Sequence, residues 1–170
     1  MGREVRKVPA DWQHPKDEKG SYIPLHDRSY AKAVASWDEE YAQWQKGFRL
    51  DWSAEGRAWK PKDDDMKGMK FSEWAGRRPD EADYMPDWPD EKRTHLMMYE
   101  DTTEGTPISP AFKTPEELAR WLADNGASAF GSSTATYEQW LATCRGAWAP
   151  SMVMDAKGLR SGVEFAAEKV

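Results

Sequence analysis

The chain has 170 residues, of which 39% are hydrophobic and 32% charged, and its net charge is −6. No apolar run approaches the ~20 residues of a membrane span, and the single cysteine, Cys144, excludes an internal disulfide. Residues 61–104 hold 13 Asp or Glu against 7 Lys or Arg, so the chain lacks the basic cluster of a general nucleic-acid binder and suits a partner with a basic surface.

A single domain, 1–170, is predicted because two domains of this total length would each be small and poorly stabilised. Leu, Ile and Val are scarce, whereas the chain contains 10 Trp, 6 Tyr and 8 Met. Burial must therefore depend on a few large side chains, each removing roughly 150–250 Å² from water. We expect a small, loop-rich α+β domain with about three main helices, a small sheet and an extended N-terminal arm.

An extended arm is predicted for residues 1–28, because at 8–25 large side chains lie among prolines and charges in a pattern that suits neither a helix nor a strand. Residues that precede proline favour extended backbone, so we expect this segment to run over the surface. Its expected anchors on the rest of the domain are Trp12, Tyr22 and Leu25. The alternative is that the arm packs on a partner.

A helix is predicted for residues 29–46, because apolar residues recur there at steps of four, three, four and three. Ser29 or Asp27 is a suitable N-cap, and Gly47 is a suitable stop. We interpret the aromatic stripe as a core face, with docking into a partner's groove as the alternative. The stripe consists of Tyr30, Val34, Trp37, Tyr41 and Trp44.

Residues 47–93 lack a sustained period and contain many glycines and prolines, so only brief regular elements are expected there. Aromatic residues are nevertheless interspersed, whereas disordered segments are poor in them. This acidic and aromatic segment is therefore predicted to be loop-rich and ordered, or to become ordered on binding.

A compact α+β unit is predicted for residues 94–170. The segment 94–101 is the best strand candidate because its apolar core is continuous. A helix is predicted to begin after Thr114, which can form a capping box with Glu117, and to end at Asn125-Gly126.

The rest of this unit holds a second helix and weaker signals. Thr136 and Gln139 can form another capping box, and Gly146 is expected to end the helix that follows. We predict a strand at 148–154, a turn at Lys157-Gly158 and a last short element at 163–167.

No catalytic motif, metal set or cofactor site is strong enough for us to predict one. The histidines, His14, His26 and His95, have no partner cysteines and no zinc-binding spacing. Cys144 falls on the inner face of a predicted helix and is interpreted as a buried small residue. The stretch 130–136, F-G-S-S-T-A-T, has the small hydroxyl residues of a phosphate-binding turn but lacks the ending of a P-loop, so we interpret it as a helix cap.

The acidic middle of the chain provides a more specific hypothesis. Carboxylates separated by multiples of roughly 3.3 Å along an extended, proline-stiffened chain can imitate a row of phosphates and occupy a basic channel. The alternative is a solvated loop that keeps the protein in solution. The expected aromatic anchors are Trp74, Tyr84 and Trp88, and the expected charge contacts are Asp83, Asp87 and Asp90.

Several short blocks make the chain similar to a family of small bacteriophage and prophage accessory proteins, over most of its length. These blocks are V-P-A-D-W-Q-H-P at 8–15, Y-M-P-D-W-P at 84–89, E-G-T-P-I-S-P-A-F at 104–112, T-P-E-E-L-A-R-W-L-A-D-N-G-A-S-A-F at 114–130 and S-G-V-E at 161–164. The resemblance implies a setting, a bacterial cell during infection or lysogeny. It implies no activity and no site residue.

The expected function is that of a non-enzymatic binding protein that engages and inhibits a host or defence protein complex with a basic surface. No apolar segment near Met1 can serve as a secretion signal, so we expect the host cytoplasm. Direct contact with nucleic acid or a membrane is not expected, no cofactor is predicted, and a homodimer is left open. The alternatives are an enzyme or small-molecule-binding protein with a site assembled from scattered residues, and a structural or assembly protein of the virion.

Overall fold

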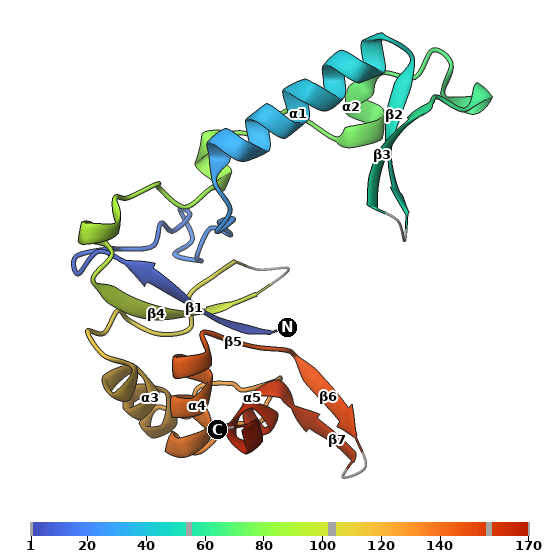
Figure 1. Cartoon of the computed structure of the whole chain (residues 1–170). Coiled ribbons are helices and arrows are strands. Elements are labelled where there is room, and N and C mark those ends of the chain that lie inside the picture. The colour runs from blue at the N-terminus through green and yellow to red at the C-terminus, as the bar shows by residue number, and fades with distance from the viewer. Residues whose placement is uncertain (1, 54–55, 102–104, 156–157, 170) are drawn as a thin grey trace. The chain divides into compact units, whose positions relative to one another are not determined.

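The computed structural model describes residues 2–53, 56–101, 105–155 and 158–169 (Figure 1). The chain forms two compact units: unit 1 is Met1–Asp27 with Pro86–Val170, and unit 2 is Arg28–Met85. Unit 2 is thus inserted into the sequence of unit 1. Helices and small antiparallel sheets make the fold α+β, as predicted. Among the residues described, no helix is long and apolar enough to cross a membrane.

Unit 1 is built on a three-stranded antiparallel sheet with the strand order β4-β1-β5. β1 (Arg3–Val8) lies in the centre, β4 (His95–Glu100) pairs with it along its full length, and β5 (Trp148–Ala149) pairs with its first two residues. Strand β4 lies where the prediction for 94–101 placed it.

Strand β1 occupies the start of the segment 1–28, which was predicted as an extended arm but not as part of a sheet. Four of its six residues are charged, which conceals the strand in the sequence. Arg3 and Arg6 are nevertheless buried, because their guanidinium groups find backbone acceptors: Arg3 Nε donates to the carbonyl of Ser128 (2.8 Å), and Arg6 Nη1 donates to that of Leu25 (2.9 Å).

Three helices of unit 1, α3 (Pro115–Asp124), α4 (Tyr137–Gly146) and α5 (Gly162–Ala166), gather on one side of this sheet (Figure 1). Burying large apolar side chains between these helices and the sheet contributes ~1.5–3 kcal/mol each. The fully buried side chains of this core include Met98, Leu118, Leu122, Trp140 and Val163.

The starts of α3 and α4 confirm the predicted capping boxes. Thr114 Oγ1 accepts a hydrogen bond from the amide of Glu117 at 3.2 Å, and the Glu117 side chain accepts one from the Thr114 amide. Thr136 and Gln139 repeat this arrangement in α4. Side-chain oxygens thus satisfy amide groups that a helix cannot pair itself.

Helix α4 ends at Gly146, as predicted. Gly146 is the last helical residue, and Ala147 takes the left-handed conformation with φ 63°. This conformation is unfavourable for a residue with a Cβ atom and is usually left to glycine.

The strand predicted at 148–154 is divided in the structure. Its first two residues form β5, and β6 (Met152–Asp155) then pairs with β7 (Gly158–Ser161) in a hairpin. Of the turn predicted at Lys157-Gly158, Lys157 lies outside the described residues. The element predicted at 163–167 corresponds to α5 and to the 3-10 turn Ala167–Lys169 that follows it.

The rest of the arm packs on unit 1, as predicted. Leu25 is buried, and its amide donates to the carbonyl of Gly105 (3.2 Å). The ring of Trp12 meets that of Trp88 edge-on, with their centroids 4.7 Å apart. Tyr22 is 41% exposed, and its ring makes an edge contact with the ring of His14.

Unit 2 contains helix α1 (Tyr30–Gln45), a hairpin of β2 (Phe48–Ser53) and β3 (Gly56–Pro61), and the short helix α2 (Phe71–Ala75). Helix α1 lies where the sequence predicted it: Ser29 caps it, and Gly47 follows it with φ 92°. The hairpin is longer than the brief elements expected in 47–93. The short 3-10 turns of that segment are Asp64–Met66, Glu81–Asp83 and Asp90–Lys92.

The core of unit 2 is small and aromatic. Trp44, Met66 and Phe71 are buried together, and Trp37 packs against them half-buried. Tyr41, which belongs to the same stripe of α1, is 42% exposed, so the stripe is a core face only in part.

Candidate functional site

The hairpin of unit 2 has one apolar face, which we call the hairpin face. Residues directly opposite each other on paired strands share a face, and so do alternate residues along a strand. Leu50 lies opposite Trp59, and Trp52 lies opposite Arg57. The members of the hairpin face are Phe48, Leu50, Trp52, Arg57, Trp59 and Pro61.

Exposure along the hairpin face is lowest at Leu50, between Phe48, which is 39% exposed, and Trp52. Leu50 is 8% exposed, whereas Trp52 at the far end is 75% exposed. Arg57 does not cover Trp52: its guanidinium lies 5.5 Å from the ring of Trp59 and is paired with Glu39 at 3.0 Å. The face therefore presents a large, exposed aromatic ring two residues beyond the buried Leu50.

The opposite face of the hairpin is polar and internally paired. Asp51 lies 2.9 Å from Arg49 and 2.5 Å from Lys60, and Arg49 also contacts Asp63 at 3.0 Å. Hydrogen bonds from Lys60 and then Arg49 lower the pKa of Asp51. These contacts hold both strands to the loop that follows, which supports the position of the hairpin face.

A second aromatic group lies on α1 and α2. Trp37 and Tyr41 stack at 5.4 Å, and Trp44 stacks on Trp74 at 6.1 Å. Trp74 is 41% exposed, so one side of its ring stays open to a partner. A cavity of about 500 Å³ borders this group, and its lining includes Lys62.

The predicted aromatic anchors have different environments. Trp74 is exposed as a partner contact requires. Tyr84 is 6% exposed, packs on Tyr30 with ring centroids 5.5 Å apart, and accepts a long hydrogen bond from Arg28 (3.4 Å). Little of its ring is therefore open to a partner, and its role as an anchor stays a prediction. Trp88 is half-buried in unit 1 against Trp12.

The predicted charge contacts are divided between the two units. Asp83 belongs to unit 2, where Arg77 lies 2.5 Å from it. Asp87 and Asp90 belong to unit 1; Asp87 is exposed, and Asp90 is paired with Arg93. Arginine partners therefore offset part of the charge that sequence reasoning assigned to a continuous acidic row.

Trp52 and the hairpin face were missed by sequence reasoning. The signal was present, because Phe48, Leu50 and Trp52 alternate with polar residues, and this alternation is typical of a half-buried strand. Neighbouring glycines and prolines led us to expect only brief elements there.

The residues considered for chemistry have structural roles. Cys144 is buried, and burial, with a smaller contribution from Glu116, raises its pKa to about 12, so its thiol stays protonated at neutral pH. The stretch 130–136 leads into the capping box of α4, as interpreted. In the described part of the chain, no group of three or more His, Cys, Asp or Glu is placed to hold a metal ion.

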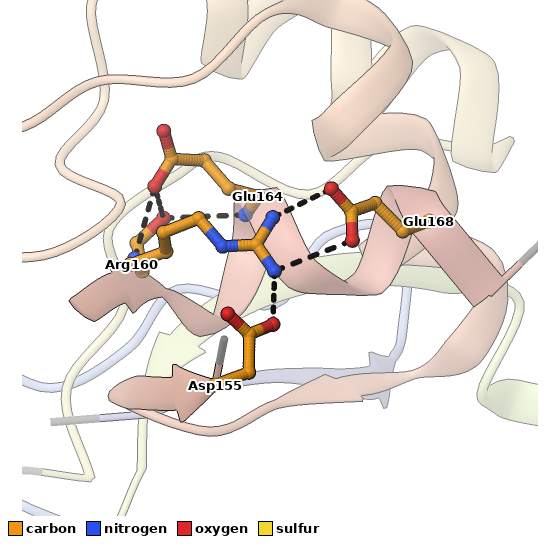
Figure 2. A network of polar contacts seen from close by, with 5 residues as sticks. Asp155, Arg160, Glu164 and Glu168 are labelled. Carbon is orange, nitrogen blue, oxygen red and sulfur yellow. Dashed lines mark hydrogen bonds and ion pairs between the residues drawn. The ribbon is translucent and has the colours of Figure 1, made fainter. Parts of the chain in front are cut away.

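A charged cluster joins the β6–β7 hairpin to the C-terminal turn (Figure 2). Arg160 donates to Asp155 at 2.5 Å and to Glu168 at 2.6 Å. Next to it, Ser161 and Glu164 form the capping box of α5. The cluster pairs its cation with carboxylates of its own chain, and we assign it to the packing of unit 1.

No family model matches the chain, and no curated protein and no solved structure is similar to it.

Proposed function

We propose that the protein is a non-enzymatic binding protein that engages a host or defence protein complex in a bacterial cell. The phage setting rests on the sequence blocks described above. The observation that carries the proposal is Trp52, which is 75% exposed on a strand that is buried at Leu50. A Trp side chain has only two rotatable bonds and so loses little conformational entropy on binding, and Trp is enriched among the residues that dominate binding energies.

The proposed partner offers an apolar pocket for Trp52 beside a basic surface. The net charge of −6 favours association with such a surface and opposes association with an acidic one. Trp74, exposed on the same unit, is the second proposed anchor. Inhibition follows if the surface that this unit covers is the partner's own working surface.

The test compares the affinities of two variants for the partner, so it does not depend on capture alone. A partner is first captured from bacterial lysate with the tagged full chain, identified by mass spectrometry and purified. We expect Trp52→Ala to weaken its binding at least tenfold, because truncating a central Trp anchor costs roughly 2 kcal/mol or more.

The matched control is Met154→Ala. Met154 is 76% exposed, like Trp52, but lies on the β6–β7 hairpin of unit 1. Its substitution is expected to change the affinity less than twofold, and both variants should keep the wild-type melting temperature. Equal affinities of Trp52→Ala and wild type would remove the hairpin face from the proposal.

The charge of the partner is tested separately with Asp83→Lys/Asp87→Lys. We expect this double variant to bind more weakly and to lose part of the salt dependence of the wild type, because it reverses two charges near a basic surface. Binding that is unchanged at both low and high salt would contradict the role of the acidic segment.

A further inference from the structure

Unit 1 contains a cavity that the proposed function does not use, and we call it the arm pocket. Its volume is about 800 Å³, within the ~300–1,000 Å³ range of small-molecule sites. It lies between the arm, strand β4, residues 107–111 and helix α3, all parts of unit 1. Three aromatic residues contribute to its lining, Trp12, Tyr22 and Trp121.

Two of these rings are held in place by contacts of unit 1. The indole Nε1 of Trp12 donates to the hydroxyl of Tyr99 at 3.2 Å, and the ring also contacts Trp88. Trp121 packs against Phe112 with ring centroids 6.1 Å apart. Aromatic walls that are fixed before binding favour a flat, aromatic ligand.

A bulge in the chain forms another wall of the arm pocket. The amides of Ile108 and Phe112 donate to the carbonyls of Met98 and Leu96 of β4, both at 2.8 Å. The two donors are four residues apart in sequence, whereas their acceptors are only two residues apart. The residues between them, 109–111, are therefore displaced from regular pairing. Ser109 Oγ replaces the missing partner by accepting from the Met98 amide (2.9 Å).

The bulge leaves backbone donors at the pocket wall. Within the residues described, the amides of Ser109 and Ala111 have no hydrogen-bond acceptor, and both residues line the pocket. A backbone amide without an acceptor can donate a hydrogen bond to an anionic group.

The charge of the lining points the same way. Of the described lining residues, Lys16 alone is a formal cation, and none is an acid; its Nζ lies 4.6 Å from the centroid of the Tyr22 ring. His14 adds no charge at neutral pH, because burial lowers its pKa. An anion therefore meets a cation and amide donors, without a carboxylate to repel it.

We propose that the arm pocket binds a small molecule made of a flat aromatic ring and one acidic group, either a carboxylate or a phosphate. The ring lies against Trp12 and Trp121, and the acidic group lies at Lys16 and the bulge. This site is independent of the hairpin face, since every residue that forms it belongs to unit 1.

The test uses the full chain with 15N-labelled tryptophan and four probes: indole-3-acetate, phenyl phosphate, indole-3-acetamide and cyclohexylacetate. The indole N–H signals of Trp12 and Trp121 are assigned with Trp→Phe variants. We expect at least one aromatic acid to shift both signals saturably while the signal of Trp52 stays in place. The neutral amide and the non-aromatic acid should bind at least about fivefold more weakly.

Lys16→Met and Lys19→Met form the matched pair of variants, since Lys19 is an exposed arm residue outside the lining. We expect the first to weaken binding of the aromatic acid about fivefold and the second to leave it unchanged. Unmoved Trp12 and Trp121 signals with both aromatic acids at about 5 mM, or equal binding of acid and amide, would overturn the proposal. Partner binding through Trp52 is measured separately, so either proposal can fail alone.

Discussion

His14 is a residue of the arm whose contacts depend on pH. The side chain is buried, and its Nε2–H donates to the carbonyl of Ile23 at 2.7 Å, which leaves Nδ1 to accept from the Tyr99 hydroxyl at 3.2 Å. Burial, then repulsion from Arg6, lowers the pKa of His14, although the Ile23 carbonyl acts in the opposite direction. Burial also raises the pKa of Tyr99 to about 12, so its hydroxyl keeps the proton that it donates.

We predict that the free energy of unfolding falls as the pH is lowered from about 7.5 to 5. In the unfolded chain His14 takes up a proton near pH 6.5, whereas the folded pKa lies lower, so stability is complete above ~6.5 and is lost as the pH falls toward the folded pKa. Urea unfolding of wild type and His14→Gln at both pH values measures the effect.

The variant should show a flatter profile than the wild type. Burial raises the pKa of Asp27, so this residue makes the free energy of unfolding rise as the pH falls, opposite to His14. Because Asp27 is present in both proteins, its contribution cancels when their profiles are compared. Identical pH profiles would mean that His14 is not held neutral in the folded protein.

At the scale of single elements, helix α4 ends in an unfavourable order of residues. Gly146 is helical, where glycine costs roughly 0.5–1 kcal/mol relative to alanine, and Ala147 is left-handed, where glycine would be preferred. A Cβ atom added at Gly146 would meet no heavy atom within 4 Å.

The exchange Gly146→Ala/Ala147→Gly is therefore expected to stabilise the protein by about 1–2 kcal/mol. Thermal and urea unfolding of the double variant measure the gain, and the two single variants divide it between the helical and the left-handed position. A loss of stability would show that the loop after α4 needs the alanine side chain.

The elements that sequence reasoning found are those with a local chemical signal. Thr114 and Thr136 begin capping boxes that can be recognised in the sequence, and 94–101 has a continuous apolar run. Strand β1 has no such signal, because burial of Arg3 depends on distant partners such as the carbonyl of Ser128, 125 positions away. The candidate site followed the same rule: exposure of Trp52 and burial of Tyr84 depend on packing that no local pattern records.

At the scale of the whole molecule, the two units differ in the size of their cores. Unit 1 buries a set of large side chains completely, whereas the cluster in unit 2 centres on Trp44, Met66 and Phe71, each still 4–7% exposed. A smaller core leaves less free energy to oppose local opening.

We predict that unit 2 opens at a lower free energy than unit 1. Native-state hydrogen exchange with increasing urea should show faster exchange for the amides of α1 and β2 than for those of β1 and β4. A single free energy for all of these amides would instead mean that the chain unfolds as one cooperative domain, in line with the single domain, 1–170, predicted from the sequence.

The central position of β1 also constrains how the protein is made. The ribosome synthesises this strand before both of its partners, because β4 begins only at His95 and β5 at Trp148, while the contiguous unit 2 is complete at Met85. Both edges of β1 therefore lack their partner strands at a stage when all of unit 2 has been made. Charged residues oppose the pairing of exposed strand edges with other chains, so we expect the four charges of β1 to protect the nascent protein from aggregation.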